Sequence, residues 1–295
     1  MHSVALLTPS HAKDLERFAL LCESIDACLT GYTRHYVVVN DDDVPLFAKY
    51  RSEKRVVVPV SRYLPKWLWA VPAALLRSRR RVWLSLLSRP VHGWHVQQIA
   101  KIAGVIAAPE ERVCIIDSDN FFFRKFDIGR YAGAAKSPLY VDHNAIRADA
   151  PFHSIWLRNC DALLGLTGTS FPADDFVGNV LVWDKATVHA MTEAIRSATG
   201  RSWQLALCRK RPFSEYLLYG RFVTTSPIHL AAHEIVERSL ALAHWDETRL
   251  DKSSISAMMH HASPEQVALC IQSYSGTSIR DIRGVLSAAM EHEPA

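Results

Sequence analysis

The feature that most constrains the fold of this chain is an alternation, in its first half, of short apolar runs with helix-like segments. The apolar runs have strand length and are rich in β-branched residues: SVALLT (3–8), HYVVVN (35–40), RVVVPV (55–60) and RVCIID (112–117). Between the first two runs, apolar residues recur at helical spacing over residues 15–29. Strands that alternate with helices and read as continuous apolar runs predict a parallel α/β sheet covered on both faces.

The remaining elements are predicted from the same two periodicities. Two further strands are expected, at 138–143 and 178–183. Helices are expected at 95–107, 154–166, 185–198, 214–222 and 232–242, and an amphipathic helix beyond residue 277.

Residues 61–94 interrupt this pattern with four tryptophans and many arginines. We expect an irregular excursion with one or two short helices. Arginine gathers at Arg77, Arg79, Arg80 and Arg81. Three interpretations remain open: an acceptor-site insertion, a packed subdomain with a basic rim, or a peripheral contact with a membrane surface, where tryptophan and arginine both find partners.

Composition and termini favour the cytoplasm, including the inner face of the plasma membrane. The N-terminal apolar run has no basic leader and ends at Pro9, so it reads as a strand rather than a signal peptide. No stretch reaches the roughly 18 apolar residues of a spanning helix. The six cysteines show no zinc or redox spacing, and the net charge of +4 is mild. Nucleic-acid binding would rest on the arginine cluster alone, so we expect no nucleic-acid partner.

The segment CIIDSDNFFF (114–123) is the most informative one for function. Asp117 ends a predicted buried strand, at the edge where parallel sheets place their ligand sites. An extended backbone would point the carboxylates of Asp117 and Asp119 the same way, and their repulsion would favour a bound Mg²⁺ or Mn²⁺. The alternative is a simple polar turn. The three phenylalanines that follow favour the ligand site, because a surface turn rarely returns to the core at once.

With these residues in view, the sequence resembles a bacterial family of GT-A glycosyltransferase-like proteins, largely described as a domain of unknown function. The resemblance covers roughly residues 3–276. It is carried by LLTPSHAKDLERFALLCESI, the acidic turn after HYVVVN, YLPKW, GWHVQQIAKI, CIIDSDNFFF, FVGNVLVW and FSEYLLYG. It implies a GT-A-like, Rossmann-like single domain over 1–295, with a mixed, mainly parallel central sheet and a D-x-D motif. The donor half would span 3–123 and the acceptor half 124–295.

The resemblance also implies a binding site for a nucleotide-sugar, with a UDP-sugar favoured. The loop after the first strand and the end of the second would hold the nucleoside, the helix at 95–107 would face the donor, and the D-x-D turn would hold metal and diphosphate. The residues concerned are Thr8, Pro9, Ser10, Asn40, Asp41, Gln98, Lys101, Asp117, Ser118 and Asp119. Each polar residue outside the acidic pair has an alternative role as a helix cap or a solvated face.

Candidate catalytic residues lie further along the chain. In inverting enzymes of this type the base stands well downstream of the D-x-D, and Glu215 in FSEYLLYG matches that placement. Its alternative role is to satisfy a helix start capped by Ser214.

Asp174 and Asp175 in FPADDFVGN are the competing pair, with Asp175 as the candidate catalytic acid; either would hydrogen-bond sugar hydroxyls, and the alternative is a solvated loop. Gly178 and Asn179 begin a strand where backbone would approach the donor sugar.

A histidine near the C-terminus often completes the metal shell in enzymes of this type. The candidate is His260, with His261 and His244 as alternatives. The flexible segment SYSGTS (273–278) would close over the diphosphate or serve as an ordinary loop.

Other classes fit less well. A haloacid-dehalogenase phosphatase carries its D-x-D on the first strand, and a sugar nucleotidyltransferase needs a glycine-rich basic loop where this chain has TPSHAKD. We expect a metal-dependent glycosyltransferase that transfers a sugar from a nucleotide-sugar to a cell-surface polysaccharide or glycolipid precursor. The rival is a non-catalytic domain of the same fold that binds nucleotide-sugar or glycan as a pathway scaffold.

Overall fold

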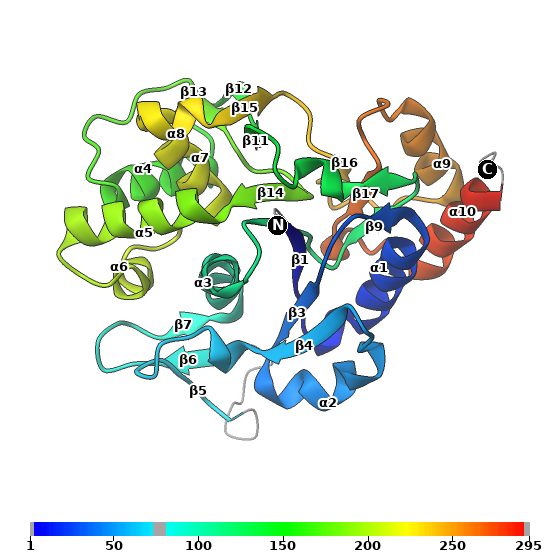
Figure 1. Cartoon of the computed structure of the whole chain (residues 1–295), viewed down its shortest axis with the longest axis horizontal. Coiled ribbons are helices and arrows are strands. Elements are labelled where there is room, and N and C mark those ends of the chain that lie inside the picture. Colours follow the sequence, from blue (N-terminus) through cyan, green and yellow to red (C-terminus); the bar gives the residue numbers. More distant parts are fainter. Residues whose placement is uncertain (1–2, 73–80, 292–295) are drawn as a thin grey trace.

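The predicted apolar runs pair into one five-stranded sheet in the order β14-β8-β1-β3-β4. The computed structural model describes residues 3–72 and 81–291 (Figure 1). The strands are β1 (Val4–Pro9), β3 (His35–Val39), β4 (Arg55–Pro59), β8 (Arg112–Ile115) and β14 (Leu181–Asp184). β4, β3, β1 and β8 run parallel, whereas β14 pairs antiparallel with β8. The fold is therefore mixed α/β with a mainly parallel sheet, as predicted.

Both faces of the sheet are covered by helices. Every residue of β1 is buried. Ala5 and Leu7 join the hydrophobic cluster that holds α3 (Gly93–Ala107), whereas Val4 and Leu6 join the cluster that holds α1 (Leu15–Cys28). The two helices accordingly lie on either side of β1 (Figure 1). Burial on both faces explains why the strands read as continuous apolar runs.

A helical layer extends the cluster around α3. It contains α4 (His153–Leu163), α5 (Lys185–Thr199), α6 (Trp203–Arg209) and α7 (Glu215–Thr225). Asp184 caps α5 by accepting a hydrogen bond from the Thr187 backbone at 2.8 Å, and α5 ends at Gly200 with φ of 65°. α4, α5 and α7 agree with the predicted helices to within a turn at each end, whereas α6 was not predicted.

A smaller layer packs on the other side of α1. Its sheet has the order β16-β17-β9, with β16 (Ala241–His244), β17 (Ala268–Ile271) and β9 (Asn120–Phe122). The helices α9 (Lys252–His261) and α10 (Ile279–Glu291) lie beside it (Figure 1). Phe121 and Phe123 pack here against Ile282 and Leu286. The chain thus returns to the core directly after the acidic turn.

The excursion differs from its prediction. Its described part forms a small antiparallel sheet of β5 (Trp69–Ala70), β6 (Val82–Leu84) and β7 (Val91–His92), preceded by the 3-10 turn η4 (Val60–Arg62). No α-helix occurs in residues 61–72 or 81–92. Trp83 is buried in the main core, so it is a packing residue. Arg77, Arg79 and Arg80 lie outside the described residues.

The helix predicted at 232–242 is wrong. A short helix, α8 (Pro227–Ala231), ends before it, and the segment forms β15 (His233–Val236) followed by β16. β15 pairs parallel with β11 (Ser137–Tyr140), and β16 with β17. The predicted strand at 178–183 likewise begins only at Leu181. Pairing partners distant in sequence decided these cases, which local periodicity does not contain.

The other short elements connect these layers. They are β2 (Leu29–Thr30), β10 (Phe126–Asp127), β12 (Asp142–Ile146), β13 (Ala173–Asp175), α2 (Val44–Phe47) and the 3-10 turns η1 (Ala12–Asp14), η2 (Asp41–Asp43), η3 (Ala48–Tyr50), η6 (Ile128–Tyr131) and η7 (Ser273–Ser275). Among the described residues, no helix has both the length and the apolar character needed to cross a bilayer.

Candidate functional site

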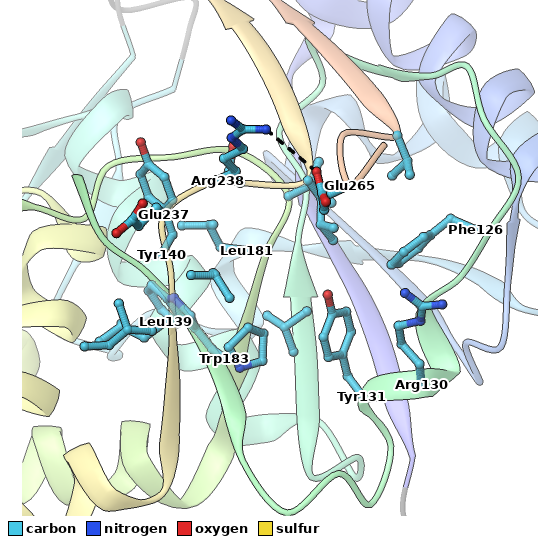
Figure 2. Close-up of a pocket in the computed structure, with 18 of the residues that line it drawn as sticks. Phe126, Arg130, Tyr131, Leu139, Tyr140, Leu181, Trp183, Glu237, Arg238 and Glu265 are labelled. Carbon is cyan, nitrogen blue, oxygen red and sulfur yellow. Dashed lines mark ion pairs between the residues drawn. The ribbon is translucent and has the colours of Figure 1, made fainter. Parts of the chain in front are cut away.

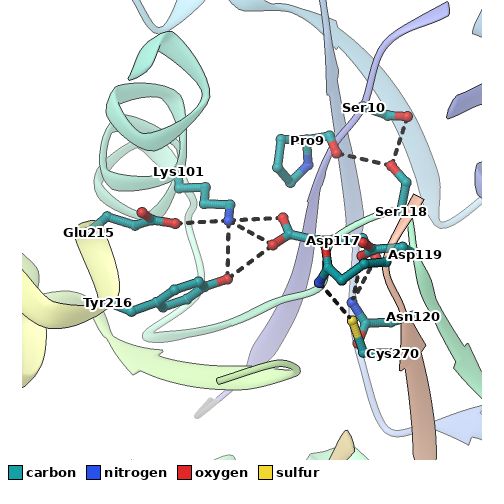
Figure 3. A network of polar contacts seen from close by, with 11 residues as sticks. Pro9, Ser10, Lys101, Asp117, Ser118, Asp119, Asn120, Glu215, Tyr216 and Cys270 are labelled. Atoms are coloured by element: carbon teal, nitrogen blue, oxygen red, sulfur yellow. Dashed lines mark hydrogen bonds and ion pairs between the residues drawn. The ribbon is translucent and has the colours of Figure 1, made fainter. Parts of the chain in front are cut away.

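The acidic turn follows β8 directly, at the carboxyl edge of the central sheet. Ser118 joins it to the loop after β1, because its hydroxyl donates to the Pro9 carbonyl at 3.2 Å and to the Ser10 hydroxyl at 2.9 Å (Figure 3). The structure therefore brings the predicted site residues Pro9, Ser10 and Ser118 together. Carboxyl ends of parallel strands are where α/β proteins place their ligands.

The backbone of Asp117, Ser118 and Asp119 is a turn, so the prediction of an extended backbone is wrong. The Asn120 backbone N–H donates to the Asp117 carbonyl at 3.2 Å, and the Asn120 side-chain amide donates to the same carbonyl at 3.0 Å. Short polar residues close such turns on their own backbone. The two carboxylates nevertheless interact electrostatically, since Asp117 acts on the titration of Asp119.

Asp119 is the perturbed acid of the site. Burial and then the negative charge of Asp117 raise the pKa of Asp119 to about 7. The Cys270 thiol lies against it from β17, and burial and Asp119 raise the pKa of that thiol well above its ordinary value. A carboxylate in this position is costly unless a cation neutralises it.

Lys101 supplies positive charge from the neighbouring helix α3. Its Nζ lies 2.9 Å from each carboxylate oxygen of Asp117, 2.8 Å from Glu215 Oε1 and 3.1 Å from the Tyr216 hydroxyl (Figure 3). Burial alone would lower the pKa of Lys101, but Asp117 and then Glu215 raise it well above its ordinary value. The ammonium thus bridges the acidic turn to the start of α7.

Glu215 stands in the first turn of α7. The Ser214 side chain accepts a hydrogen bond from the Leu217 backbone at 3.4 Å, which makes Ser214 the cap that the sequence predicted. Glu215 is only 3% exposed and is paired with Lys101. The carboxylate is therefore both a first-turn acid, as the helix dipole prefers, and a member of the network around Asp117.

Two further predicted residues carry buried amides without partners. Both polar side-chain atoms of Gln98, three residues before Lys101 on α3, lack a hydrogen-bond partner among the described residues, as does Asn179 Nδ2. Asn179 stands two residues before Leu181, which pairs with Ile115, itself two residues before Asp117. The next residue, Val180, has φ of 55°, a strained value for a β-branched side chain. Unsatisfied amides and backbone strain are both typical of functional sites.

The loops after β1 and β3 meet at the same edge, but their predicted residues make internal contacts. The Thr8 hydroxyl pairs with His35 Nε2 at 2.9 Å inside the core. The Asn40 amide donates to Asp43 at 2.8 Å, and Asp41 accepts from the Ser61 backbone at 3.1 Å. Thr8 is therefore a core residue, whereas Asn40 and Asp41 shape the turn at the end of β3.

The candidate pair Asp174 and Asp175 is held apart from the Lys101 network. Asp175 accepts hydrogen bonds from His153 and from the Val177 backbone, and Asp174 accepts from the Asn144 backbone at 3.0 Å. These contacts fix the loop between β13 and β14. Close packing explains the glycine at position 178, because a Cβ there would lie 2.9 Å from the Tyr140 ring.

His260 is exposed in the last turn of α9, and its ring packs against the ring of His261. The described residues contain no group of three or more His, Cys, Asp or Glu side chains that could hold a metal. His260 is thus not brought to the acidic pair, and its role as a third ligand stays a prediction.

Arg17 was not predicted from the sequence. It is only 7% exposed, and its guanidinium donates to the Ile271 carbonyl at 2.7 Å and to the Thr277 carbonyl at 3.2 Å. Its charge also acts on Asp119. Arg17 therefore ties the 273–278 segment to the acidic turn. The sequence feature that could have indicated this role is the position of Arg17, a basic residue on the same helical face as Leu20, Leu21 and Ser24.

A cavity of about 920 Å³ lies along the free edge of β14. Figure 2 shows the rings of Phe126, Tyr131 and Tyr140 around it, with the guanidinium groups of Arg130 and Arg238 at its side. Asp117 and Asp119 do not line this cavity, but Tyr216 does, and its hydroxyl lies 3.1 Å from Lys101 Nζ. Tyr216 thus connects the cavity to the polar network.

The fold and the site define a mixed α/β protein with an acidic turn at the carboxyl edge of its central sheet. The chain matches the family of unknown function DUF6492 over residues 3–291 and belongs to that family. A search of the curated proteins found no match.

Proposed function

We propose that this protein is a metal-dependent glycosyltransferase that transfers a sugar from a nucleotide-sugar, with a UDP-sugar favoured, to a cell-surface polysaccharide or glycolipid precursor in the cytoplasm. The observation that carries the proposal is the acidic turn after β8, in which burial and then the charge of Asp117 raise the pKa of Asp119. Together with the order of motifs along the chain, this turn favours a GT-A-type donor site.

The residues of the turn fit a hard divalent cation. Asp119 and Asp117 offer carboxylate oxygens on one short turn, and Mg²⁺ or Mn²⁺ takes one or two carboxylates together with substrate phosphates. A cation bound beside Asp119 would offset the burial and the negative charge of Asp117 that raise the pKa of this carboxyl. The bound metal would neutralise the charge that develops on a departing diphosphate. His260 remains a candidate for a further ligand only if α9 moves.

The donor would occupy the carboxyl edge of the sheet. Ser10, Asn40 and Asp41, after β1 and β3, would contact the nucleoside at this edge. The partnerless amides of Gln98 and Asn179 supply hydrogen-bond donors and acceptors for the sugar, because buried amides without partners are costly and a bound hydroxyl group satisfies them. Gly178, in the segment before β14, would leave the backbone there without a side chain on the donor side.

Glu215 is the favoured proton acceptor for the attacking hydroxyl of the acceptor. Its carboxylate is oriented by Lys101 at 2.8 Å, so in this arrangement Lys101 positions both the donor-side Asp117 and the candidate base. Asp175 is the alternative acid. The acceptor would enter through the cavity along β14, where the half-buried rings of Tyr131 and Tyr140 offer flat faces for sugars.

The rival function is a scaffold that binds a nucleotide-sugar or glycan without turnover. One observation favours it: Lys101 already neutralises Asp117 and Glu215 together, so the base candidate is paired and nearly inaccessible. Slow hydrolysis of UDP-sugars in the presence of Mn²⁺ separates the two functions, since the enzyme hydrolyses at least one donor and the scaffold binds UDP without turnover.

The proposal is tested by thermal unfolding with nucleoside diphosphates, with and without Mn²⁺. We expect UDP to raise the unfolding temperature only when Mn²⁺ is present, because a ligand that binds only the folded state stabilises it. Asp119→Asn should remove the Mn²⁺-dependent part of the shift. Asp149→Asn is the matched control, since the Asp149 side chain is 79% exposed and far along the chain in an outer loop. A UDP shift of the same size in Asp119→Asn would contradict the proposal.

A further inference from the structure

A second feature of the molecule lies away from the acidic turn, where the β6–β7 hairpin meets α6 and the loop before α7 (Figure 1). A shallow recess of about 860 Å³ opens there. We call its lining the Arg–Trp surface, and it is formed mainly by Leu86, Leu87, Arg89, Trp94, Arg209 and Arg211.

The apolar side chains of the Arg–Trp surface are unusually exposed. Leu86 is 94% exposed and Trp94 is 49% exposed. Trp94 packs at 5.5 Å against Trp156, which in turn lies 6.3 Å from the ring of Phe152, itself 64% exposed. The aromatic ridge therefore continues from the start of α3 onto α4. A continuous exposed apolar patch of this kind marks an interaction surface.

The charged side chains of the Arg–Trp surface are all positive. Arg209 Nε donates to the Leu87 carbonyl at 2.9 Å, and Arg211 Nη1 donates to the Pro90 carbonyl at 2.6 Å. These bonds hold the hairpin and leave the other N–H groups of both guanidinium ions for an outside acceptor. No acid lines the recess, and none of its three arginines forms an ion pair with a carboxylate in the described part of the chain.

The combination selects among possible partners. Exposed leucine, tryptophan and phenylalanine beside arginines suit a bilayer surface, where apolar side chains insert among acyl chains and arginines bind headgroup phosphates. A nucleic acid would use the arginines but leave Leu86 and Phe152 in water. An acidic protein surface would use the arginines and would not require an apolar side chain at the tip of a hairpin.

We propose that the Arg–Trp surface docks the protein onto an anionic phospholipid bilayer. Leu86, Trp94 and Phe152 insert at the headgroup boundary, while Arg89, Arg209 and Arg211 contact lipid phosphates. The proposal does not depend on the acidic turn, and it extends the membrane interpretation of residues 61–94 to arginines at 209 and 211 that lie outside that segment.

The test is co-sedimentation of the full chain with vesicles. We expect binding to phosphatidylcholine vesicles that contain about 30–40% phosphatidylglycerol, which gives the surface a negative charge. Binding to pure phosphatidylcholine vesicles should be weak. Arg89→Gln and Leu86→Ser should each weaken binding, and together they should weaken it roughly tenfold or more. Both side chains are exposed, so neither change removes a packing contact.

The controls use the same chemistry at residues that do not line the recess. Ile228→Ser replaces an apolar side chain that is 81% exposed on α8, and Arg196→Gln replaces an exposed arginine on α5. Both should bind like the parent. Inorganic phosphate at millimolar concentration should compete only weakly, since a free ion lacks the acyl chains. Equal binding of parent and double variant, equal binding to neutral vesicles, or full displacement by phosphate would each overturn the proposal.

Discussion

The side chain of Lys101 is the central positive charge of a buried polar network. It is almost fully buried, and its ammonium is the shared partner of Asp117 and Glu215. Removal of one partner from a buried ion pair leaves an uncompensated charge, which costs far more than the pair contributes. The network therefore holds α3, β8 and α7 in a fixed relation.

We predict that Lys101→Met lowers the free energy of unfolding by about 3–5 kcal/mol, because it leaves Glu215 buried without a counter-charge. The double variant Lys101→Met/Glu215→Gln should recover part of that loss, since the neutral amide tolerates the same position. Urea denaturation of the parent, both single variants and the double variant measures the coupling. Strict additivity of the two single changes would contradict this account.

Asp119, unlike Lys101, destabilises the folded protein when it is ionised. Its raised pKa means that the folded state holds a proton more tightly than the unfolded chain, so the contribution of Asp119 to stability is present below pH 3.8 and is lost as the pH rises through about 7. Ionisation of Asp119 near neutral pH is therefore destabilising unless a cation neutralises the carboxylate. Such a cost is typical of a group that is retained for binding rather than for folding.

At the scale of single elements, α3 decides whether the Lys101 network can form. The helix approaches β1 so closely that a Cβ on Gly104 would lie 2.4 Å from Leu7 Cδ1. A glycine inside a helix is otherwise unfavourable, so its presence here is explained by this contact. The glycine lets α3 bring Lys101 within hydrogen-bond distance of Asp117.

We predict that Gly104→Ala destabilises the protein by about 1–3 kcal/mol despite the better helix propensity of alanine, because it overpacks a buried contact. Gly284→Ala on α10 is the control: its Cβ would meet only the Lys252 side chain, at 3.7 Å, so this variant should be neutral or more stable by about 0.5–1 kcal/mol. Thermal unfolding of both variants checks the prediction. Greater stability of Gly104→Ala would show that α3 has room to move.

At the scale of the whole molecule, buried neutral histidines link stability to pH. Burial and then Arg211 lower the pKa of His95 to about 3, and burial and Arg55 lower the pKa of His35 well below its ordinary value. The unfolded chain binds protons at these rings near pH 6.5, whereas the folded chain does not. Their contribution to stability is therefore full above pH 6.5 and is lost as the pH falls towards 3.

We predict that His95→Gln makes the fall of unfolding free energy with acid shallower by up to about 1.4 kcal/mol per pH unit between pH 6 and 4.5, which is the contribution of one proton. The glutamine amide can still reach the Leu207 carbonyl that His95 contacts at 2.9 Å. Urea denaturation at several pH values compares the slopes. Parallel slopes for parent and variant would show that His95 is protonated in the folded state.

Much of the central sheet was predictable because its information is local. The runs at 3–8, 35–40, 55–60 and 112–117 became β1, β3, β4 and β8, and the acidic turn stands at the predicted edge. The prediction of a helix at 232–242 was wrong because this segment forms β15, which is stabilised by its pairing with β11. The prediction of an extended backbone from Asp117 to Asp119 was wrong because the Asn120 side chain donates a hydrogen bond to the Asp117 carbonyl and closes a turn.

The sequence alone determined which segments are strands and helices in the parallel core, because burial on both faces leaves its mark in every residue of a strand. It also determined that two acids follow a buried strand. Only the tertiary structure decided what surrounds them: Lys101 between Asp117 and Glu215, Arg17 behind Asp119, and His260 on an exposed helix. Those contacts join residues that are far apart in the chain. A local sequence pattern contains no information about such distances, because they arise only when the chain folds.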